Sequence, residues 1–456
     1  MPEPATRFLI IDYNLSRVGD VQRMAEYARS AYGAAVTLIR PNPTATDHRI
    51  CDEVIDLDPL RTDFVEAGEK LLADRSHEFA AGVVFSDNAV AGGAELLKRL
   101  GLAVDSPALA DGAFCKHAYR SAEARSRDLL TAQRVLVPDF ARIRSRAGLD
   151  DFAARHPEGF VVKPTKEGNN RGVVLVGPGD DVDAAFAEVL PYLEDGVICE
   201  TVIPYRREYS YDGLGGLSFL TEKVSATGRY PVEVAQILPA RVDRAERGTL
   251  QRAGRLANLL VGQCDGPFHN EIKLSDDGQY AAVVEPNRRP AGMRIWSLAE
   301  WVYGVDLYRL WVDAAYGRSG DVELPAPGCS AAAVMLGVAG DRTFGPDDVA
   351  PGATPFEDAV DRAAAHHGLA PGELSAMDFA WLSPGRRPIH AVPRDNADFA
   401  AMGCVVLRTD RVPAREVVDT LRAAWPTALE RSCGPAAAPA HATSHQDRRT
   451  ELEVTR

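Results

Sequence analysis

The chain has 456 residues, a hydrophobic share of 46% and a formal net charge of −14. At about 150 residues per domain, this length allows roughly three domains, and the composition is that of an ordinary folded protein. The negative charge argues against a general nucleic-acid binder, whose affinity rests on basic patches. Because no apolar run reaches about 18 residues and no signal-like start is present, we expect a cytoplasmic protein that does not enter a membrane.

Near the N-terminus, short apolar runs alternate with helix-like stretches, which predicts an open parallel α/β sheet. The runs are 8–12, 34–39, 53–56 and 82–86. No G-x-G-x-x-G follows the first run, which disfavours a dinucleotide-binding domain. Ser86 and Asp87 close the fourth run, at the strand end where open sheets bind ligands. They are substrate-side candidates, although the same residues commonly cap helices.

Residues 159–176 predict a β-hairpin with a polar loop between glycines. Its first strand carries Lys163, and its loop carries Gly168 and Gly172. The glycines would let backbone N–H groups approach phosphate oxygens, and Lys163 would add a positive charge. A lysine beside a glycine loop is also common in ordinary hairpins, and this one is not a P-loop, since no G-x-x-x-x-G-K-[ST] occurs in the chain.

Residues 268–292, FHNEIKLSDDGQYAAVVEPNRRPAG, predict a second β-hairpin whose turn is Ser275–Gly278. If the loop is residues 276–278, a type I turn closed by a left-handed glycine, then paired residue numbers sum to 554. Glu271 would then face Val283, and His269 would face Glu285. A two-residue turn would instead put Glu271 and Glu285 on different faces.

In that register, acids, an amide and basic groups share one face of the hairpin. The set is His269, Glu271, Lys273, Glu285, Asn287 and Arg289. Two carboxylates and an amide oxygen are hard ligands that suit magnesium, and an arginine offers a planar fork for phosphate or carboxylate. The alternative is a solvated hairpin face crossed by salt bridges.

The order of these residues resembles the metal-binding hairpin of the ATP-grasp superfamily, with a Glu on one strand and Glu-x-Asn-x-Arg-x-x-Gly on the next. HNEIKLSDDG followed by VVEPNRRPAG looks most like the carboxylate–amine ligase branch, which includes the L-amino-acid ligases. The resemblance implies that Glu271, Glu285 and Asn287 bind one or two Mg²⁺, with Mn²⁺ as an alternative. It also implies that Arg289 holds the transferred phosphoryl group. Arg288 departs from the pattern and would add a charge beside the site.

The same resemblance assigns a nucleotide site to the upstream segments. In Val197–Pro204 it implies an adenine pocket made by Glu200, Val202 and Ile203, and in the next strand it makes Glu208 the acceptor for ribose hydroxyls. Outside this context, both glutamates would be ordinary surface charges.

The resemblance also implies that four residues of the 159–176 hairpin and one lysine of a preceding helical segment, Lys116, bind the phosphates. Lys163, Gly168, Asn169 and Gly172 would close over ATP as a lid, with Lys163 also catalytic beside Arg289. Lys116, in a segment resembling the family's approach to the grasp domain, would reach the phosphates, with a surface-helix lysine as the alternative.

The implied architecture is α/β: an N-terminal open parallel sheet, a lid, a central antiparallel grasp domain and a small C-terminal α/β segment. The boundaries we expect are 1–115, 116–324 with the lid at about 130–200, 325–433, and a disordered tail at 434–456. Residues 295–316 have helical periodicity that indicates core packing. Arg294 and Trp296 lie where the pocket is expected and are further substrate candidates.

The resemblance implies an ATP-dependent ligase with small-molecule carboxylate and amine substrates and without nucleic-acid or membrane partners; a homodimer is left open. ATP would convert the carboxylate to an acyl phosphate, and the amine would displace phosphate to give an amide. Three alternatives stand beside it: an ATP-grasp carboxylase or purine-pathway enzyme, a non-catalytic ATP-binding module, and a dehydrogenase built on the N-terminal sheet.

Overall fold

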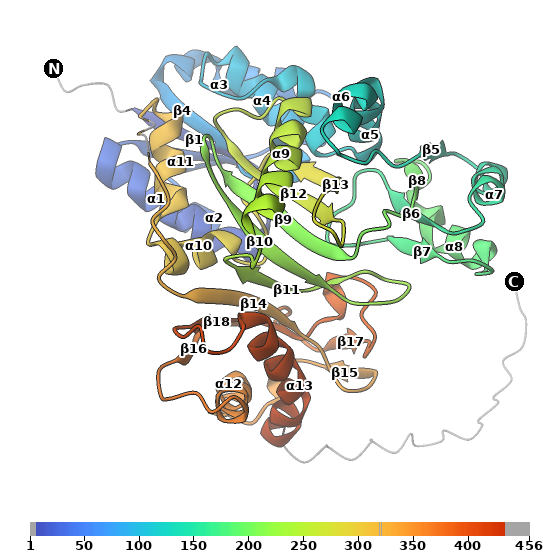
Figure 1. The fold of residues 1–456 in the computed structure, drawn as a ribbon. Coiled ribbons are helices and arrows are strands. Elements are labelled where there is room, and N and C mark those ends of the chain that lie inside the picture. The colour runs from blue at the N-terminus through green and yellow to red at the C-terminus, as the bar shows by residue number, and fades with distance from the viewer. Residues whose placement is uncertain (1–5, 319, 321, 434–456) are drawn as a thin grey trace, which may run out of the picture.

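The computed structural model describes residues 6–318, 320 and 322–433. Four sheets organise these residues, and Figure 1 shows them as an N-terminal body, a protruding lid and a long central sheet that continues into the C-terminal part. Within the described residues, no helix is long and apolar enough to span a membrane. The tail expected at 434–456 lies outside the described residues.

The N-terminal body is the predicted open parallel sheet, with strand order β3-β2-β1-β4. Its central strand is entirely apolar from Phe8 to Ile11 and fully buried, as expected for a strand covered on both faces. The strands are β1 (Arg7–Ile11), β2 (Ala35–Arg40), β3 (Glu53–Asp56) and β4 (Phe79–Val84). The helices are α1 (Val18–Tyr32), α2 (Asp47–Ile50), α3 (Phe64–Leu72) and α4 (Val90–Arg99).

The lid is a separate four-stranded sheet with its own core, in which Phe152 and Phe160 pack edge to face. Its strand order is β5-β8-β6-β7, and the predicted hairpin is the β6–β7 pair. The strands are β5 (Phe140–Ile143), β6 (Phe160–Pro164), β7 (Val174–Val176) and β8 (Val197–Thr201). Helices α7 (Arg146–Arg155) and α8 (Val182–Val189) cover it, and α5 (Lys116–Arg125) and α6 (Arg127–Ala132) lead into it.

The central sheet has eight strands in the order β13-β12-β9-β10-β11-β14-β18-β16, all paired antiparallel. Its first five strands by position come from the predicted grasp domain: β9 (Arg207–Leu214), β10 (Leu217–Ser225), β11 (Glu233–Leu238), β12 (Pro267–Leu274) and β13 (Ala281–Asn287). Helix α9 (Arg244–Leu260) begins with a capping box between Asp243 and Glu246. It buries Leu250, Ala253 and Ala257 against the sheet.

The long strands of the C-terminal segment extend the central sheet from β11 onward. These strands are β14 (Ser330–Leu336), β16 (Leu374–Trp381) and β18 (Ala401–Leu407). Helices α12 (Pro355–His366) and α13 (Ala414–Ser432) pack on this end (Figure 1). The short strands β15 (Arg342–Phe344) and β17 (Arg387–Ile389) form a two-stranded sheet.

The helical stretch at 295–316 is two helices, α10 (Ile295–Tyr303) and α11 (Leu307–Ala315). Gly304 ends the first with φ +70°, a left-handed conformation that glycine adopts without steric cost. Asp306 caps the second by accepting from two backbone N–H groups. Trp296 is 1% exposed and packs on Tyr308. It is therefore a core residue, and the prediction that it lines the pocket is wrong.

Candidate functional site

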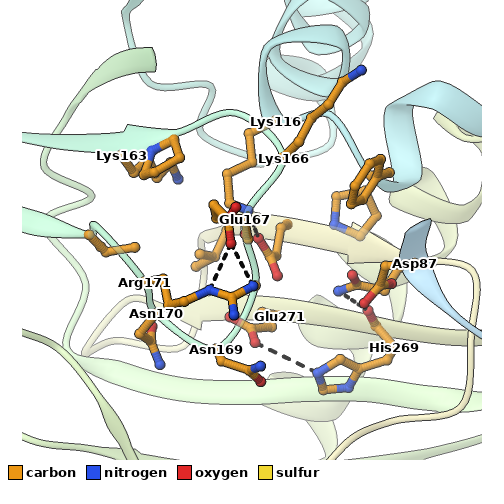
Figure 2. Close-up of a pocket in the computed structure, with 18 of the residues that line it drawn as sticks. Asp87, Lys116, Lys163, Lys166, Glu167, Asn169, Asn170, Arg171, His269 and Glu271 are labelled. Atoms are coloured by element: carbon orange, nitrogen blue, oxygen red, sulfur yellow. Dashed lines mark hydrogen bonds and ion pairs between the residues drawn. The ribbon is translucent and has the colours of Figure 1, made fainter. Parts of the chain in front are cut away.

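A cavity of about 990 Å³ opens where the N-terminal sheet, the lid and the central sheet meet. Figure 2 shows its lining residues, with the lid loop on one side and the second hairpin across from it. Most of the predicted site residues contribute to the lining. Gly172 does not, although its two neighbours in the chain do, and neither do Arg288, Arg294 and Trp296.

The second hairpin, β12–β13, has a different register from the predicted one. Ser275 N donates to Tyr280 O at 2.9 Å, so the loop holds residues 276–279, one more than expected. Gly278 is left-handed as predicted, with φ +70°. An irregularity follows in the ladder between Glu271 and Ile272, and beyond it Glu271 pairs with Glu285. The predicted pairing of Glu271 with Val283 is therefore wrong.

The predicted shared face is nevertheless present, because the β-bulge at Val284 restores the alternation that the longer loop shifts. His269 pairs with Asn287 across the two strands. All six predicted residues of this face line the cavity: His269, Glu271, Lys273, Glu285, Asn287 and Arg289.

The two facing glutamates are held by different lysines. Lys223 Nζ lies 2.6 Å from Glu271 Oε1, and Lys116 Nζ lies 2.9 Å from Glu285 Oε2. Burial opposes ionisation of both acids, but the lysine charges outweigh it, and the pKa of each glutamate is below its ordinary value. Both side chains are therefore carboxylates at neutral pH, as metal ligands must be.

Sequence reasoning missed Lys223 and Glu233. Lys223 Nζ is also 2.6 Å from Glu233 Oε1, which places one lysine between two acids. Burial lowers the pKa of Lys223, but the charges of Glu233 and Glu271 raise it above its ordinary value. Beside this group, Lys273 Nζ lies 2.9 Å from Glu208 Oε1, so the proposed ribose acceptor is already held in place. The alternation of residues in 217–225 could have indicated a strand that carries Lys223, and in the structure Lys223 pairs with Glu208 on the neighbouring strand.

His269 is the most perturbed histidine of the cavity. Its Nδ1 donates to Asp212 Oδ1 at 2.6 Å, and its Nε2 lies 3.6 Å from Glu271 Oε1 (Figure 2). The fully buried Asp212 also accepts from Ser210 and Thr221, at 2.6 and 2.7 Å. Burial lowers the pKa of His269, but the charge of Asp212 and the hydrogen bonds outweigh it and raise the pKa to about 9.

Lys116 joins the lid loop to the β12–β13 hairpin. It is the first residue of α5, and its Nζ donates to Glu167 O at 2.7 Å as well as pairing with Glu285. The structure thus places the predicted phosphate-binding lysine inside the cavity and away from the solvated helix surface that the alternative reading required.

Lys163, Glu200 and Arg120 form a buried ion network at the root of the lid. Glu200 Oε2 is 2.8 Å from Lys163 Nζ, and Glu200 Oε1 is 3.0 Å from Arg120 Nε. Burial raises the pKa of Glu200, but the two cations outweigh it and lower the pKa to about 2. Sequence reasoning gave no role to Arg120, which also donates to the carbonyls of Val283 and Val284 on β13.

The segment after β8 faces the cavity with apolar side chains. Val202 is 40% exposed and Ile203 is half-buried, and both line the cavity beside Glu200. The carboxylate of Glu200 is engaged by Arg120 and Lys163.

The lid loop bends through three left-handed residues. Asn169, Asn170 and Gly172 have φ values of 58°, 61° and 67°. A salt bridge of 2.6 Å between Glu167 and Arg171 spans the loop (Figure 2). Asn169 O accepts from Asn396 N of the C-terminal segment at 3.3 Å, so the loop touches both ends of the cavity.

Three arginines near the end of the hairpin have different surroundings. Arg289 Nε lies 2.7 Å from Asp87 Oδ2, which brings the predicted phosphoryl-binding residue to the N-terminal sheet. Arg294 lies outside the cavity lining, paired with Asp378 at 3.2 Å. Arg288 donates to the carbonyls of Ser106 and Val261, at 2.7 and 3.2 Å. It is buried away from the cavity, so the prediction that it adds a charge beside the site is wrong.

No family model and no curated protein matches this chain. Among solved structures, it is similar to L-amino acid ligase from Bacillus licheniformis, with a TM-score of 0.68, 16% identity, and 94% of this chain and 98% of that chain covered. It is also similar to phosphoribosylglycinamide synthetase from Anaerococcus prevotii, with a TM-score of 0.62, 13% identity and coverages of 94% and 99%. The ADP complex of N5-carboxyaminoimidazole synthetase from Staphylococcus aureus has a TM-score of 0.61, 16% identity and coverages of 92% and 97%. At these identities, the likeness shows the fold.

Proposed function

We propose that this chain, which has the ATP-grasp fold, is an ATP-dependent ligase that joins a small carboxylate, such as an amino acid, to an amine through an acyl phosphate. The observation that carries the proposal is the direct pairing of Glu271 with Glu285 on the cavity wall, between Lys116 and Lys223. Two buried carboxylates that face each other repel unless cations balance their charge. Here lysines balance it, and bound metal ions would take over this role from the lysines.

The residues present fit magnesium or manganese. Glu271 and Glu285 are ionised carboxylates, and Asn287, which also lines the cavity, uses its amide nitrogen and not its Oδ1 to donate to His269 O at 3.2 Å. These are the hard oxygen donors that Mg²⁺ takes together with phosphate oxygens. A bound Mg²⁺ would neutralise charge on the phosphates as the phosphoryl group is transferred.

ATP would lie between the lid and the central sheet. In this proposal, Lys116 and Lys163 hold the phosphates, and Gly168, Asn169 and Gly172 of the lid loop supply backbone donors. The adenine packs against Val202 and Ile203, and Glu208 accepts from the ribose hydroxyls. All but Gly172 line the same cavity, and Gly172 sits in the loop between two residues that do.

The reaction needs an electrophile, because a carboxylate resists attack by amines at neutral pH. An oxygen of the substrate carboxylate attacks the γ-phosphorus, and the bond to ADP breaks. The neutral amine then attacks the acyl carbon, the bond from this carbon to the phosphate oxygen breaks, phosphate leaves, and the nitrogen loses a proton to solvent to give the amide. Arg289 holds the transferred group through both steps, and the closed lid keeps water from the acyl phosphate. The cytoplasm, where ATP is plentiful, is the location we propose.

The test is ADP release from Mg-ATP across an array of carboxylates and amines, singly and in pairs. We expect release that requires one carboxylate and one amine together. Glu271→Gln and Glu285→Gln should each lower the rate by on the order of 100-fold, because each removes a charged oxygen ligand. Asp276→Asn, at the exposed tip of the same hairpin, should leave the rate unchanged. Full turnover by Glu285→Gln would show that the metal assignment is wrong.

A second candidate function is a carboxylase acting on a nucleotide-like amine, which the similarity to N5-carboxyaminoimidazole synthetase favours. Bicarbonate in the same array distinguishes it, since ADP release would then depend on bicarbonate in place of an organic carboxylate. ATP binding without ADP release across the whole array would instead indicate a non-catalytic module.

A further inference from the structure

The N-terminal sheet contributes to the cavity wall two charged residues that have no role in the proposed ATP site. Asp12 directly follows β1, and Arg40 is the last residue of β2, the strand beside it. Asp12 N donates to Ile39 O at 2.7 Å, which holds the ends of strands β1 and β2 side by side. Ser86, just beyond β4, lies on the other side of Asp12 and donates to its carboxylate.

The carboxylate of Asp12 is buried and has no ion pair among the described residues. Asp12 is 5% exposed and lines the cavity. Ser86 is the one side chain in that part of the chain that donates to it, and the backbone of Tyr13 donates as well. Burial raises the pKa of Asp12 above its ordinary value, although these hydrogen bonds and the nearby charge of Arg40 oppose the shift.

The guanidinium of Arg40 has an unused donor. Arg40 is 6% exposed, lies over the Tyr13 ring at 4.7 Å, and lines the cavity. Its Nη1 approaches Asp47 at only 3.4 Å, and its Nη2 donates to none of the residues that the structure describes. Asp47 is satisfied without it, because Thr44 N and Thr44 Oγ1 donate to it at 2.6 and 2.8 Å and Tyr13 donates as well.

We propose that Asp12 and Arg40 form the subsite for the amine substrate, and that this substrate carries a carboxylate of its own. The proposal rests on the proposed ligase function. The substrate's ammonium would bind Asp12 and its carboxylate would bind the free edge of Arg40. Neighbouring strands lie about 4.8 Å apart, so two groups on adjacent strand ends can hold the two charges of one small zwitterion.

The order of the strands fixes which end of the substrate reacts. Across the sheet, β2, β1 and β4 present Arg40, Asp12 and Ser86 in that order, and Asp87 next to Ser86 contacts Arg289. The amine at Asp12 therefore lies on the side of the phosphoryl-binding arginine, and the carboxylate at Arg40 lies away from it. The nucleophile's own carboxylate would be kept out of the phosphoryl transfer, and the product would retain it.

The experiment compares each acceptor amino acid with its carboxamide, which keeps the amine and removes the negative charge. With a fixed carboxylate donor and Mg-ATP, kcat/KM for ADP release should be about 10- to 100-fold higher for the acid, the value of a charged hydrogen bond. Arg40→Gln should abolish this preference by lowering kcat/KM for the acid alone. Arg40→Lys, which keeps the charge but not the fork, should restore part of it.

The acid-to-carboxamide ratio does not depend on how much enzyme is folded, so a stability defect in Arg40→Gln cannot imitate the expected result. Arg49→Gln is the matched control, because Arg49 is exposed on neighbouring α2 and does not line the cavity, and its side chain donates to Thr46 alone among the described residues. An equal kcat/KM for acid and carboxamide in the wild type, or an unchanged ratio in Arg40→Gln, would overturn the proposal.

Binding separates failure of the subsite from failure of the ligase function. If no pair releases ADP, thermal shift with the twenty L-amino acids and their carboxamides tests the subsite alone. A rise in Tm with an amino acid that is absent with its carboxamide, and lost in Arg40→Gln, would support the subsite while rejecting the ligase. No such selective rise would reject both.

Discussion

His269 carries the clearest pH signature of any single residue. Its pKa is about 9 in the folded protein, against about 6.5 in an unfolded chain. A raised histidine pKa stabilises the fold fully below pH 6.5, and this contribution is lost as the pH rises through 9. At about 1.4 kcal/mol per pKa unit, the contribution to the free energy of unfolding is on the order of 3 kcal/mol.

Urea unfolding of the metal-free protein in EDTA at pH 6, 7.5 and 9 measures this effect. The free energy of unfolding of the wild type should fall toward that of His269→Gln as the pH rises, because the imidazolium contact with Asp212 disappears. His48→Gln, an exposed histidine on α2, should keep the wild-type pH dependence. Parallel curves for wild type and His269→Gln would show that the pKa of His269 is not raised in the folded protein.

At the same scale, the candidate binding residues were easier to predict than the residues that form ion pairs with them. Glu271, Glu285 and Lys163 stand in a recognisable order along the chain, and all three reach the cavity. Lys223 and Arg120 have no such local signal. Lys223 contacts Glu271 and Arg120 contacts Glu200, and both acids lie on strands far away in the sequence. These contacts can be recognised only when the order of the strands in the sheets is known.

Among the elements, the β12–β13 hairpin shows what a sequence pattern can and cannot give. Alternation and the Ser-Asp-Asp-Gly turn predicted two strands with the acids on one face, which is what forms. The register was wrong because the loop is one residue longer and a bulge follows. The bulge adjoins Pro286, which has no N–H to donate, and β13 is the edge strand of the sheet, the place where prolines and bulges are tolerated.

The lid loop depends on Gly172 for a reason that can be tested against a second glycine. Gly172 has φ +67°, and a Cβ there would lie 2.8 Å from Tyr192 and 2.9 Å from Pro164. Gly179 also has a positive φ, +81°, but open space around it. An alanine would therefore cause a similar backbone strain at both sites, about 1 kcal/mol. A steric clash of the added Cβ occurs only at Gly172.

We expect Gly172→Ala to displace the lid loop and to weaken ATP binding by about tenfold, because the loop backbone moves away from the phosphates. Gly179→Ala should bind ATP as the wild type does. Isothermal titration calorimetry with Mg-ATP measures both affinities, and circular dichroism checks that both variants are folded. Equal affinities in the two variants would show that close packing at Gly172 does not position the loop.

For the whole molecule, the cavity exists because separate bodies are fixed against each other. Arg23 of α1 contacts Glu300 of α10 and Asp306 before α11, at 2.6 and 2.5 Å, and so fastens the N-terminal sheet to the central part. The N-terminal sheet was predictable from its own alternation of strands and helices, and the lid and central sheet were expected from the family resemblance. The joining of β14 to β11 was not, because that pairing links strands nearly a hundred residues apart and leaves no local pattern in either.

This continuity of the central sheet makes the C-terminal segment part of one cooperative unit. Gly403 tests it, because it lies in β18, between β14 and β16, and a Cβ there would be 2.2 Å from a ring carbon of Phe356. The ring is 1% exposed in the core under α12 and has little room to move. Such overpacking destabilises a core by about 1–3 kcal/mol.

Gly403→Ala should therefore lower the Tm of the entire protein by several degrees in a single transition, with no early step confined to the C-terminal strands. The measurement is thermal unfolding followed in parallel by far-UV circular dichroism and tryptophan fluorescence, since Trp381 and Trp425 report on the C-terminal core and Trp296 and Trp311 on the other side of the sheet. Gly385→Ala, in an exposed turn with open space around it, should leave the Tm unchanged. Two separate transitions in Gly403→Ala would mean that the C-terminal strands unfold independently. The eight strands would then form one hydrogen-bonded sheet that does not unfold as one cooperative unit.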